Sequence, residues 1–181
     1  MTLSPASVIE VWKDAGPAQW FAKSLSFDQA LRAHFEVPHF FAASGGHDDW
    51  AETADGALAL LILLDQIPRN LFRESGHAFA TDGKARKIAR EAIAAGHDLS
   101  TEPLLRPFFY LPFEHAEDLA DQDFGLAAME RGEVDPDTLK WGRLHRDIIV
   151  RFGRFPHRNA ALGRMTTPEE QAFLDEGGFA G

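Results

Sequence analysis

The chain has 181 residues, of which 45% are hydrophobic and 11% aromatic, and it contains no cysteine. This length is sufficient for a hydrophobic core, and the lack of cysteine excludes disulfides, thiolate metal sites and thiol nucleophiles and is typical of a cytoplasmic protein. The formal net charge of −10 argues against nucleic-acid binding, which requires a positive surface.

Two helices are predicted in the first quarter of the chain. The Ser-Pro step at residues 4–5 is typical of a helix start, and Gly16 marks the end of that helix. Charged side chains run through this segment, so we expect no signal peptide. Ser26 has capping-box spacing to a glutamine and predicts the start of a second helix, which Pro38 is expected to kink or break.

The segment from Trp50 to Gln66 is predicted to be the central helix. Ala57 to Leu64 are eight apolar residues in a row, which leaves the helix without a polar face. Such a helix is normally buried on all sides, and eight residues are far fewer than the ~20 of a membrane span. Asp65 follows directly. We expect it to pair with an arginine, because an unpaired carboxylate is costly beside so much apolar surface.

Residues 67–81 are expected to be irregular but held to the core by their apolar side chains. Five more helical segments are predicted after them, at about residues 82–95, 103–110, 116–131, 136–152 and 168–174. In the helix at 136–152, an apolar stripe includes Trp141, Leu144 and His145, and His145 is therefore expected to be a core histidine. No stretch alternates apolar and polar residues with a period of two. The predicted fold class is all-α.

Charge is divided unevenly in the last third of the chain. Residues 114–137 carry nine acids against one arginine, a net charge of −8, whereas residues 140–164 carry seven bases against one aspartate, a net charge of +6. Two neighbouring helices with complementary charges explain this division, and an anion-binding face explains it equally well.

Four segments of the sequence resemble a known bacterial family. They read Leu-Leu-Asp-Gln-Ile-Pro-Arg-Asn-Leu-Phe-Arg (63–73), Ala-Phe-Ala-Thr-Asp (78–82), Tyr-Leu-Pro-Phe-Glu-His-Ala-Glu (110–117) and Arg-Phe-Gly-Arg-Phe-Pro-His-Arg-Asn (151–159). From about Trp12 to Phe179 the chain resembles the family called domain of unknown function 924. The resemblance implies one all-helical domain over residues 1–181, an irregular array similar to tetratricopeptide-repeat superhelical folds, and it brings no established activity. The family often has a serine where this chain has Ala116.

Most of the polar candidate ligand-binding residues lie in or near two similar proline turns. Residues 67–70 and 155–159 each follow an apolar helix, and we expect the two turns to meet and form a pocket that holds a carboxylate or phosphate through bidentate arginine contacts. The candidate ligand-binding residues are Asp65, Arg69, Asn70, Arg73, Arg154, His157, Arg158, Asn159 and Arg164. The structural alternative is that these arginines cap helix carbonyls and pair with acids.

His115 and His157 are the candidates for acid–base catalysis. A histidine flanked by carboxylates, as His115 is, can be oriented as a base, but we favour the interpretation that this acidic stretch starts a helix. The sequence has no metal-ligand spacing of histidines and no glycine-rich phosphate loop, so no metal and no cofactor are expected.

Two classes of function remain open for a cytoplasmic protein without a membrane segment. The favoured one is a protein that binds or acts on a small anionic metabolite in a pocket lined by arginine, histidine and asparagine. The alternative is a helical-repeat-like scaffold that binds a peptide or a partner protein. A deep arginine-lined pocket would support the first, and a long groove with exposed aromatic residues would support the second.

Overall fold

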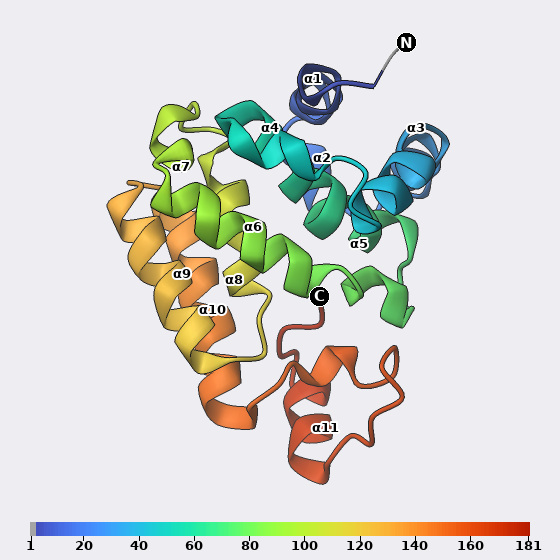
Figure 1. Ribbon diagram of the computed structural model, residues 1–181. Helices are drawn as coiled ribbons and strands as arrows, with labels where there is room; N and C mark the ends of the chain where they lie inside the picture. Colours follow the sequence, from blue (N-terminus) through green and yellow to red (C-terminus); the bar gives the residue numbers. More distant parts are fainter. Residues whose placement is uncertain (1–2) are drawn as a thin grey trace.

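The structure is a computed structural model that describes residues 3–181, and every regular element in that part of the chain is helical (Figure 1). The longer helices are α1 (Pro5–Ala15), α3 (Leu25–Ala43), α4 (Ala54–Leu61), α6 (Asp82–Ala94), α9 (Leu119–Arg131), α10 (Pro136–Phe152) and α11 (Pro168–Asp175). The shorter ones are α2 (Pro17–Trp20), α5 (Ile67–Leu71), α7 (His97–Ser100) and α8 (Leu111–Glu114). One π-helical turn (Ile62–Gln66) and four 3₁₀ turns (Asp48–Glu52, Gly76–Phe79, Arg106–Phe109 and Pro156–Arg158) complete these elements. The predicted all-α class is confirmed, and the similarity to tetratricopeptide repeats stays a prediction.

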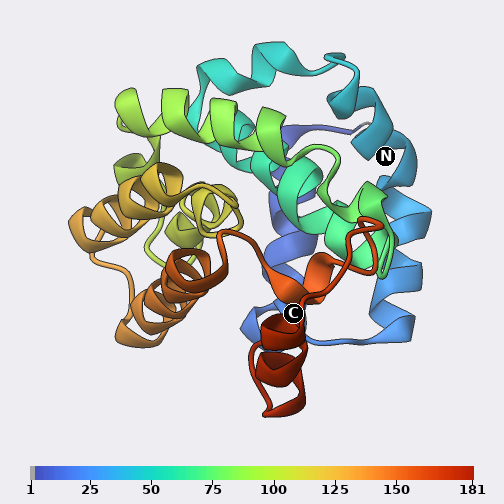
Figure 2. The same cartoon turned by 90° about the horizontal axis from the view of Figure 1, so that it is seen from below.

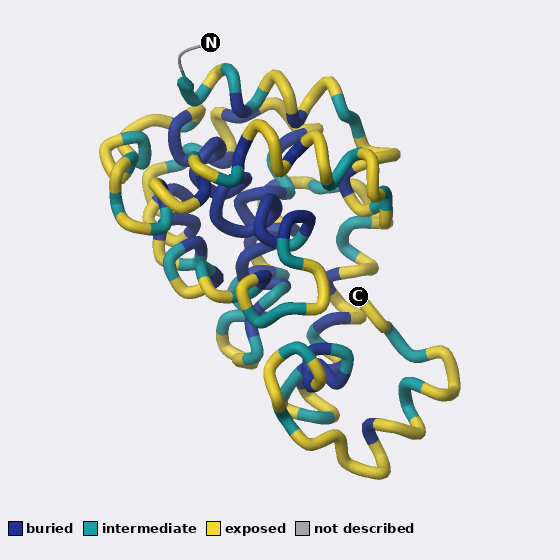
Figure 3. The backbone as a smooth tube through the Cα atoms, turned by 90° about the vertical axis from the view of Figure 1, so that its right-hand side faces the viewer, coloured by how far each residue is buried: buried dark blue, intermediate teal, exposed yellow. Residues whose placement is uncertain are grey.

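Helix α4 and the π-helical turn after it occupy the centre of the core. The side chain of Thr53 caps the start of α4 by accepting the N–H of Gly56 at 3.1 Å. Every residue from Ala57 to Leu64 is at most 1% exposed, and Figure 3 shows that the buried backbone is gathered at the centre of the body. The predicted burial of this segment is confirmed.

Truncating Leu61 to alanine tests this central position. Leu61 is fully buried, so the variant should lose about 2 to 5 kcal/mol of unfolding free energy through lost apolar burial and a residual cavity. Urea unfolding followed by circular dichroism measures the loss. Leu104 is 48% exposed, and its replacement by alanine is the matched control with an expected change of about 0.5 kcal/mol or less. Equal losses in the two variants would contradict the assignment of Leu61 to the core.

The helix does not end at Gln66 as predicted but continues into α5 through the π-helical turn. The N–H of Ile67 donates to the carbonyl of Ile62, five residues back, instead of to Leu63. Pro68 has no N–H to offer to Leu64. The carbonyl groups of Leu63 and Leu64 therefore lack the backbone donors that they would have in a regular α-helix. The expectation of an irregular chain from residue 67 is wrong for residues 67–71, which form α5.

Side chains from other elements replace the lost backbone donors. His39 Nδ1 donates to the carbonyl of Leu63 at 2.8 Å, and the hydroxyl of Thr81 donates to the carbonyl of Leu64. These contacts explain why a proline is tolerated at a buried position, because the carbonyl that it leaves free is not left unpaired.

Pro38, predicted to kink or break its helix, does not break it. Helix α3 starts two residues earlier than expected, with Ser24 as its N-cap, and runs through Pro38 without interruption. A proline inside a helix costs about 3 kcal/mol, since it removes one backbone hydrogen bond and crowds the preceding turn. Burial offsets this loss, because residues on both sides of the proline belong to one buried face, namely Leu31, Phe35, His39 and Ala42.

Two later helices also differ from their predicted bounds. The predicted helix at residues 103–110 is reduced to the 3₁₀ turn at Arg106–Phe109. Pro112 lies in the first turn of the next helix, α8, where its fixed backbone angle fits a helix start. Helix α9 starts at Leu119 rather than near Ala116, and the side chain of Asp118 caps it by accepting the N–H of Asp121 at 2.9 Å.

Complementary charges lie on the neighbouring helices α9 and α10, which pack side by side (Figure 1). Arg146 lies 2.5 Å from Asp123, and Arg143 lies 3.3 Å from Glu130. All four side chains are at least 34% exposed. The interpretation of the charge division as pairing between two helices is confirmed for these residues.

The last part of the chain, residues 155–181, is called here the C-terminal segment, and it projects from the body of the molecule (Figures 2 and 3). It packs on α10 through a small apolar cluster, in which residues 148–149 and Phe155 are buried and Phe152, Phe173 and Phe179 pack against them. Trp141 and Leu144, expected on the same stripe, are instead 52% and 39% exposed. Ion pairs supplement this cluster, as described below.

Candidate functional site

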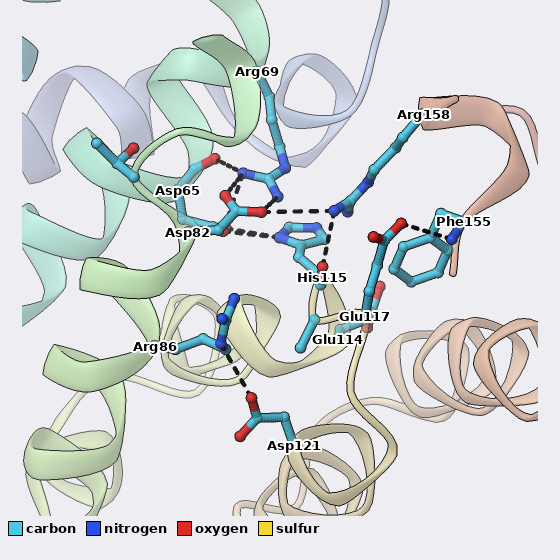
Figure 4. Close-up of polar contacts among 12 residues, drawn as sticks. Asp65, Arg69, Asp82, Arg86, Glu114, His115, Glu117, Asp121, Phe155 and Arg158 are labelled. Carbon is cyan, nitrogen blue, oxygen red and sulfur yellow. Dashed lines mark hydrogen bonds and ion pairs between the residues drawn. The ribbon is translucent and has the colours of Figure 1, made fainter. Parts of the chain in front are cut away.

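Five charged or titratable side chains, called here the charge cluster, lie where the body meets the C-terminal segment (Figure 4). They are contributed by the π-helical turn, α5, the start of α6, the residue after α8, and the turn Pro156–Arg158. The members are Asp65, Arg69, Asp82, His115 and Arg158.

Asp65 is the most deeply buried member, at 1% exposure. Its carboxylate accepts hydrogen bonds from Gln66 Nε2 at 2.6 Å and from His115 Nδ1 at 2.9 and 3.0 Å, and it lies 3.1 Å from Arg69 Nη1. Burial alone would raise the pKa of Asp65, but the charge of Arg69 and the contacts with His115 outweigh it and hold that pKa well below its usual range. The predicted pairing of Asp65 with an arginine is confirmed.

Asp82 joins the two proline turns. It accepts both terminal N–H groups of Arg69, at 2.9 and 3.0 Å, and its other contact is Arg158 Nη1 at 3.6 Å. The guanidinium groups of both arginines also lie over the ring of Phe79, at 5.6 and 4.5 Å from its centre. The turns at 67–70 and 155–159 thus meet through one arginine each.

The asparagine and the further arginine of the first turn face another way. Asn70 donates to Asp28 at 2.9 Å, and Arg73 donates to the same carboxylate at 2.6 and 2.9 Å. These residues border a surface hollow of about 230 Å³ between α3 and α5. A second hollow of about 360 Å³ lies beside Lys84 and Lys87. Neither hollow includes a member of the charge cluster.

The remaining predicted residues of the second turn hold the C-terminal segment together. Arg154 donates to Glu170 at 2.6 and 2.9 Å, and Asn159 donates to the same carboxylate at 3.1 Å. Arg164 pairs with Glu117 at 2.6 Å and thereby ties the segment to the body. These are the ion pairs that the structural alternative predicts.

His157 lies in the C-terminal segment with its ring 5.6 Å from that of Phe155 and 5.1 Å from that of Phe179. Its Nδ1 is buried and has no hydrogen-bond partner in residues 3–181. Burial, together with the positive charge of Arg158, lowers the pKa of His157 to about 3. His157 is therefore neutral near pH 7.

His115 has the geometry of an oriented base. Its side chain is 14% exposed. Burial and the charge of Arg69 lower its pKa, so the ring is neutral near pH 7, with the Nδ1 proton facing Asp65. Nε2 then carries the lone pair, and in the described part of the chain it has no partner. The favoured interpretation as a helix start is wrong, because His115 follows the end of α8.

A neutral acid lies next to this histidine. Glu114 is 6% exposed, and one carboxyl oxygen lies 3.1 Å from His145 Nδ1 while the other has no partner among residues 3–181. Burial and the negative charge of Asp65 raise the pKa of Glu114 to about 8. His145 also donates to the carbonyl of Trp141 at 2.9 Å, and burial lowers its pKa to about 3. His145 is the core histidine that the sequence predicts.

The sequence interpretation missed two members of this site, Asp82 and the buried Glu114. In the sequence, Asp82 has the pattern of an ordinary acid in the first turn of a helix, and it does lie in the first turn of α6. Glu114 is adjacent to His115, but α8 has only four residues, and no periodic pattern in so short an element indicates burial.

Among residues 3–181, no three His, Asp or Glu side chains are placed to hold a metal ion. In the same part of the chain, no helix combines the length and the apolar composition that crossing a bilayer requires.

Two comparisons with known proteins match nearly the whole chain. A family model described as a bacterial protein of unknown function (DUF924) matches residues 8–178. A solved structure of a protein of unknown function from Agrobacterium tumefaciens is 48% identical, with a TM-score of 0.91, and covers 95% of this chain and 97% of that chain. No curated protein matches.

Proposed function

The chain belongs to the DUF924 family of bacterial proteins of unknown function, and we propose that it binds a small anionic metabolite and acts on it by proton transfer at His115. The observation that carries the proposal is the contact of His115 Nδ1 with both carboxylate oxygens of Asp65, at 2.9 and 3.0 Å. This contact fixes the tautomer and leaves Nε2 as a proton acceptor. A carboxylate in this position also stabilises the imidazolium that forms when the base takes a proton.

The anionic character of the ligand is argued from Arg158. This side chain is 6% exposed and its guanidinium lies 4.5 Å from the ring centres of both Phe79 and Phe155. It makes one close hydrogen bond, from Nη1 to the carbonyl of His115 at 3.0 Å, and its buried Nε has no partner among the described residues. A guanidinium has five N–H donors, so a carboxylate or phosphate would satisfy the donors that remain.

Net charge does not favour the anion by itself. Asp65 and Asp82 balance Arg69 and Arg158, while His115 is neutral near pH 7. An anionic ligand would be attracted by the N–H groups of Arg158 that have no partner. It would also be attracted because the guanidinium groups of Arg69 and Arg158 lie close together and repel each other. Burial and the charge of Arg69 lower the pKa of Arg158 to about 10, and a second negative partner would relieve that repulsion.

A thermal-shift screen of small carboxylates and phosphates tests the proposal. The wild-type protein should be stabilised by at least one compound, by about 2.7 kcal/mol when the ligand is present at 100 times its dissociation constant. In Arg158→Gln the ligand-induced shift should be lost, whereas His115→Gln should keep binding and lose turnover of that compound. Each shift is measured against the same variant without ligand, so that a loss of stability alone does not count.

Arg151→Gln is the matched control for this screen. Arg151 lies in α10, is 49% exposed and pairs with Glu169 at 3.2 Å, so its replacement should leave the shift unchanged. A screen in which no anion stabilises the wild-type protein, or in which Arg158→Gln responds as the wild type does, would refute the proposed site.

A further inference from the structure

The chain reverses direction after α11 and returns towards the body of the molecule (Figure 1). The N–H of Gly177 donates to the carbonyl of Leu174 at 3.2 Å, and the N–H of Gly178 donates to the carbonyl of Phe173 at 2.9 Å. This pair of bonds is a Schellman motif, and its left-handed position is taken by Gly177, with a φ of 82°. A side chain on Gly178 would lie 2.5 Å from the carbonyl oxygen of Phe173. Two glycines thus set the direction in which residues 179–181, called here the strap, leave α11.

Aromatic packing holds the strap in place. The ring of Phe179 makes edge contacts with the imidazoles of His145 at 4.5 Å and His157 at 5.1 Å, and it lies 6.1 Å from the ring of Trp141. Gly181 lies against the same His157, because a Cβ on this glycine would be 3.0 Å from Cδ2 of the imidazole. In the described part of the chain, no backbone–backbone hydrogen bond joins the strap to another residue. The ring of Phe179 is therefore its main attachment.

The strap covers His157 without providing a hydrogen-bond partner. Nδ1 of this imidazole is buried and has no partner among residues 3–181. The side chain of Phe179 has no polar atom, whereas water would supply partners to both ring nitrogens once the strap is released. The closed strap therefore gains aromatic contacts, and the open strap gains hydration of the imidazole. The balance between the two states depends on whether that imidazole carries a proton.

The charges around His157 favour its neutral form. The titratable side chains that act on it are Arg158 in the same turn, Glu117 and His115 between α8 and α9, Arg69 in α5 and His145 in α10. Burial is the largest cause of the lowered pKa of His157, the charges of Arg158 and Arg69 add to it, and Glu117 opposes it. The strap has no titratable side chain, so its effect on His157 is to exclude water.

We propose that the strap is a pH-dependent cover that lies over His157 near neutral pH and is released when this imidazole takes a proton in acid. The proposal does not depend on the proposed function. Under the strap the pKa of His157 is about 3, whereas an imidazole exposed to water has a pKa of about 6.5. Between these values only the open state binds the proton, so the ratio of open to closed strap should rise by up to about 30-fold from pH 8 to pH 5. Release uncovers one side of the turn Pro156–Arg158, which carries an arginine of the charge cluster.

Amide relaxation measured by NMR on the full chain tests the proposal. In the wild-type protein the heteronuclear NOE of the Phe179 amide should match that of α11 at pH 8 and fall to the value of a flexible segment at pH 5. In His157→Gln, which has no group to protonate at this position, the NOE should be the same at both pH values. Met165→Ala is the matched control in the C-terminal segment, where the methionine is 89% exposed, and it should respond as the wild type does.

Phe179→Ala separates the cover from the titration. Without the ring the strap should be mobile at both pH values, and the imidazole resonances of His157 should titrate at least about one pH unit higher than in the wild type, a tenfold gain in proton affinity. Circular dichroism at pH 5 confirms that each variant is folded. A Phe179 amide that stays ordered at pH 5 in the folded wild type would overturn the proposal. Acid release that persists in His157→Gln would do so too, and would assign the trigger to another group such as His145.

Discussion

Replacing Asp82 with asparagine should lower the unfolding free energy by about 3 to 5 kcal/mol, because breaking a buried ion pair leaves its partners charged and unpaired. Among residues 3–181, Asp82 is the one acid that contacts both Arg69 and Arg158, and its side chain is 9% exposed. Asparagine keeps the size of the side chain, so no cavity contributes to the change. Urea unfolding at pH 7 measures the loss.

Asp121 is the control, because it also contacts two arginines but lies at the surface. It also bridges two arginines, Arg86 at 3.1 Å and Arg90 at 2.6 Å, but these three side chains are between 22% and 48% exposed (Figure 4). Asp121→Asn should cost about 1 kcal/mol or less, since water screens exposed pairs. If the two variants lost the same small amount, the charge cluster would not depend on Asp82.

Replacing Glu114 with glutamine should change the pH dependence of stability. The pKa of Glu114 is raised from 4.5 to about 8, so between these values the folded protein holds a proton that the unfolded chain has released. Stability then falls as the pH rises through this window, by up to about 1.4 kcal/mol per pH unit. Glu114→Gln removes this loss and should be more stable than the wild type at pH 8.

At lower pH, two histidines change the folding stability in the opposite direction to Glu114. The pKa values of His145 and His157 fall from 6.5 to about 3, so between these values the unfolded chain binds protons that the folded protein does not. Stability therefore falls as the pH drops through this window. Their combined effect exceeds that of Glu114 where the windows overlap, and the wild-type protein should be most stable near pH 6.5.

Melting temperatures measured from pH 4 to 9 test both the decline in stability above pH 6.5 and the decline below it. In Glu114→Gln the decline above pH 6.5 should disappear and the decline below pH 6.5 should become steeper. Glu10→Gln, at an exposed position of α1, is the control and should follow the wild-type profile. An alkaline decline that persists in Glu114→Gln would show that another group causes it.

Features that depend on neighbouring residues alone were predictable from the sequence. The eight apolar residues from Ala57 to Leu64 predict full burial, because no face of that helix tolerates water. Thr167 and Glu170 predict a capping box, and the structure contains both reciprocal hydrogen bonds. The pairing of Asp65 with an arginine was predictable for the same reason, since Arg69 lies one helical turn away.

Features that depend on distant contacts were not predictable in this way. The two helix-internal prolines, Pro38 and Pro68, are tolerated because buried side chains and the donors His39 and Thr81 come from elsewhere in the chain. The partnership of Asp82 with Arg158 joins residues 76 positions apart. Propensity and spacing describe a single element, and they do not indicate which acid a folded chain will place beside a given base.

The π-helical turn at Ile62–Gln66 sets the angular position of every later residue in the same helix. An α-helix advances by about 100° per residue, and one extra residue in a turn rotates all later side chains by that angle. Deleting one of the apolar residues 62–64 from this turn would rotate Arg69 away from Asp82 and Asn70 away from Asp28. The charge cluster therefore depends on helical register as well as on side-chain chemistry, and such a deletion would disrupt it although all five members remain in the sequence.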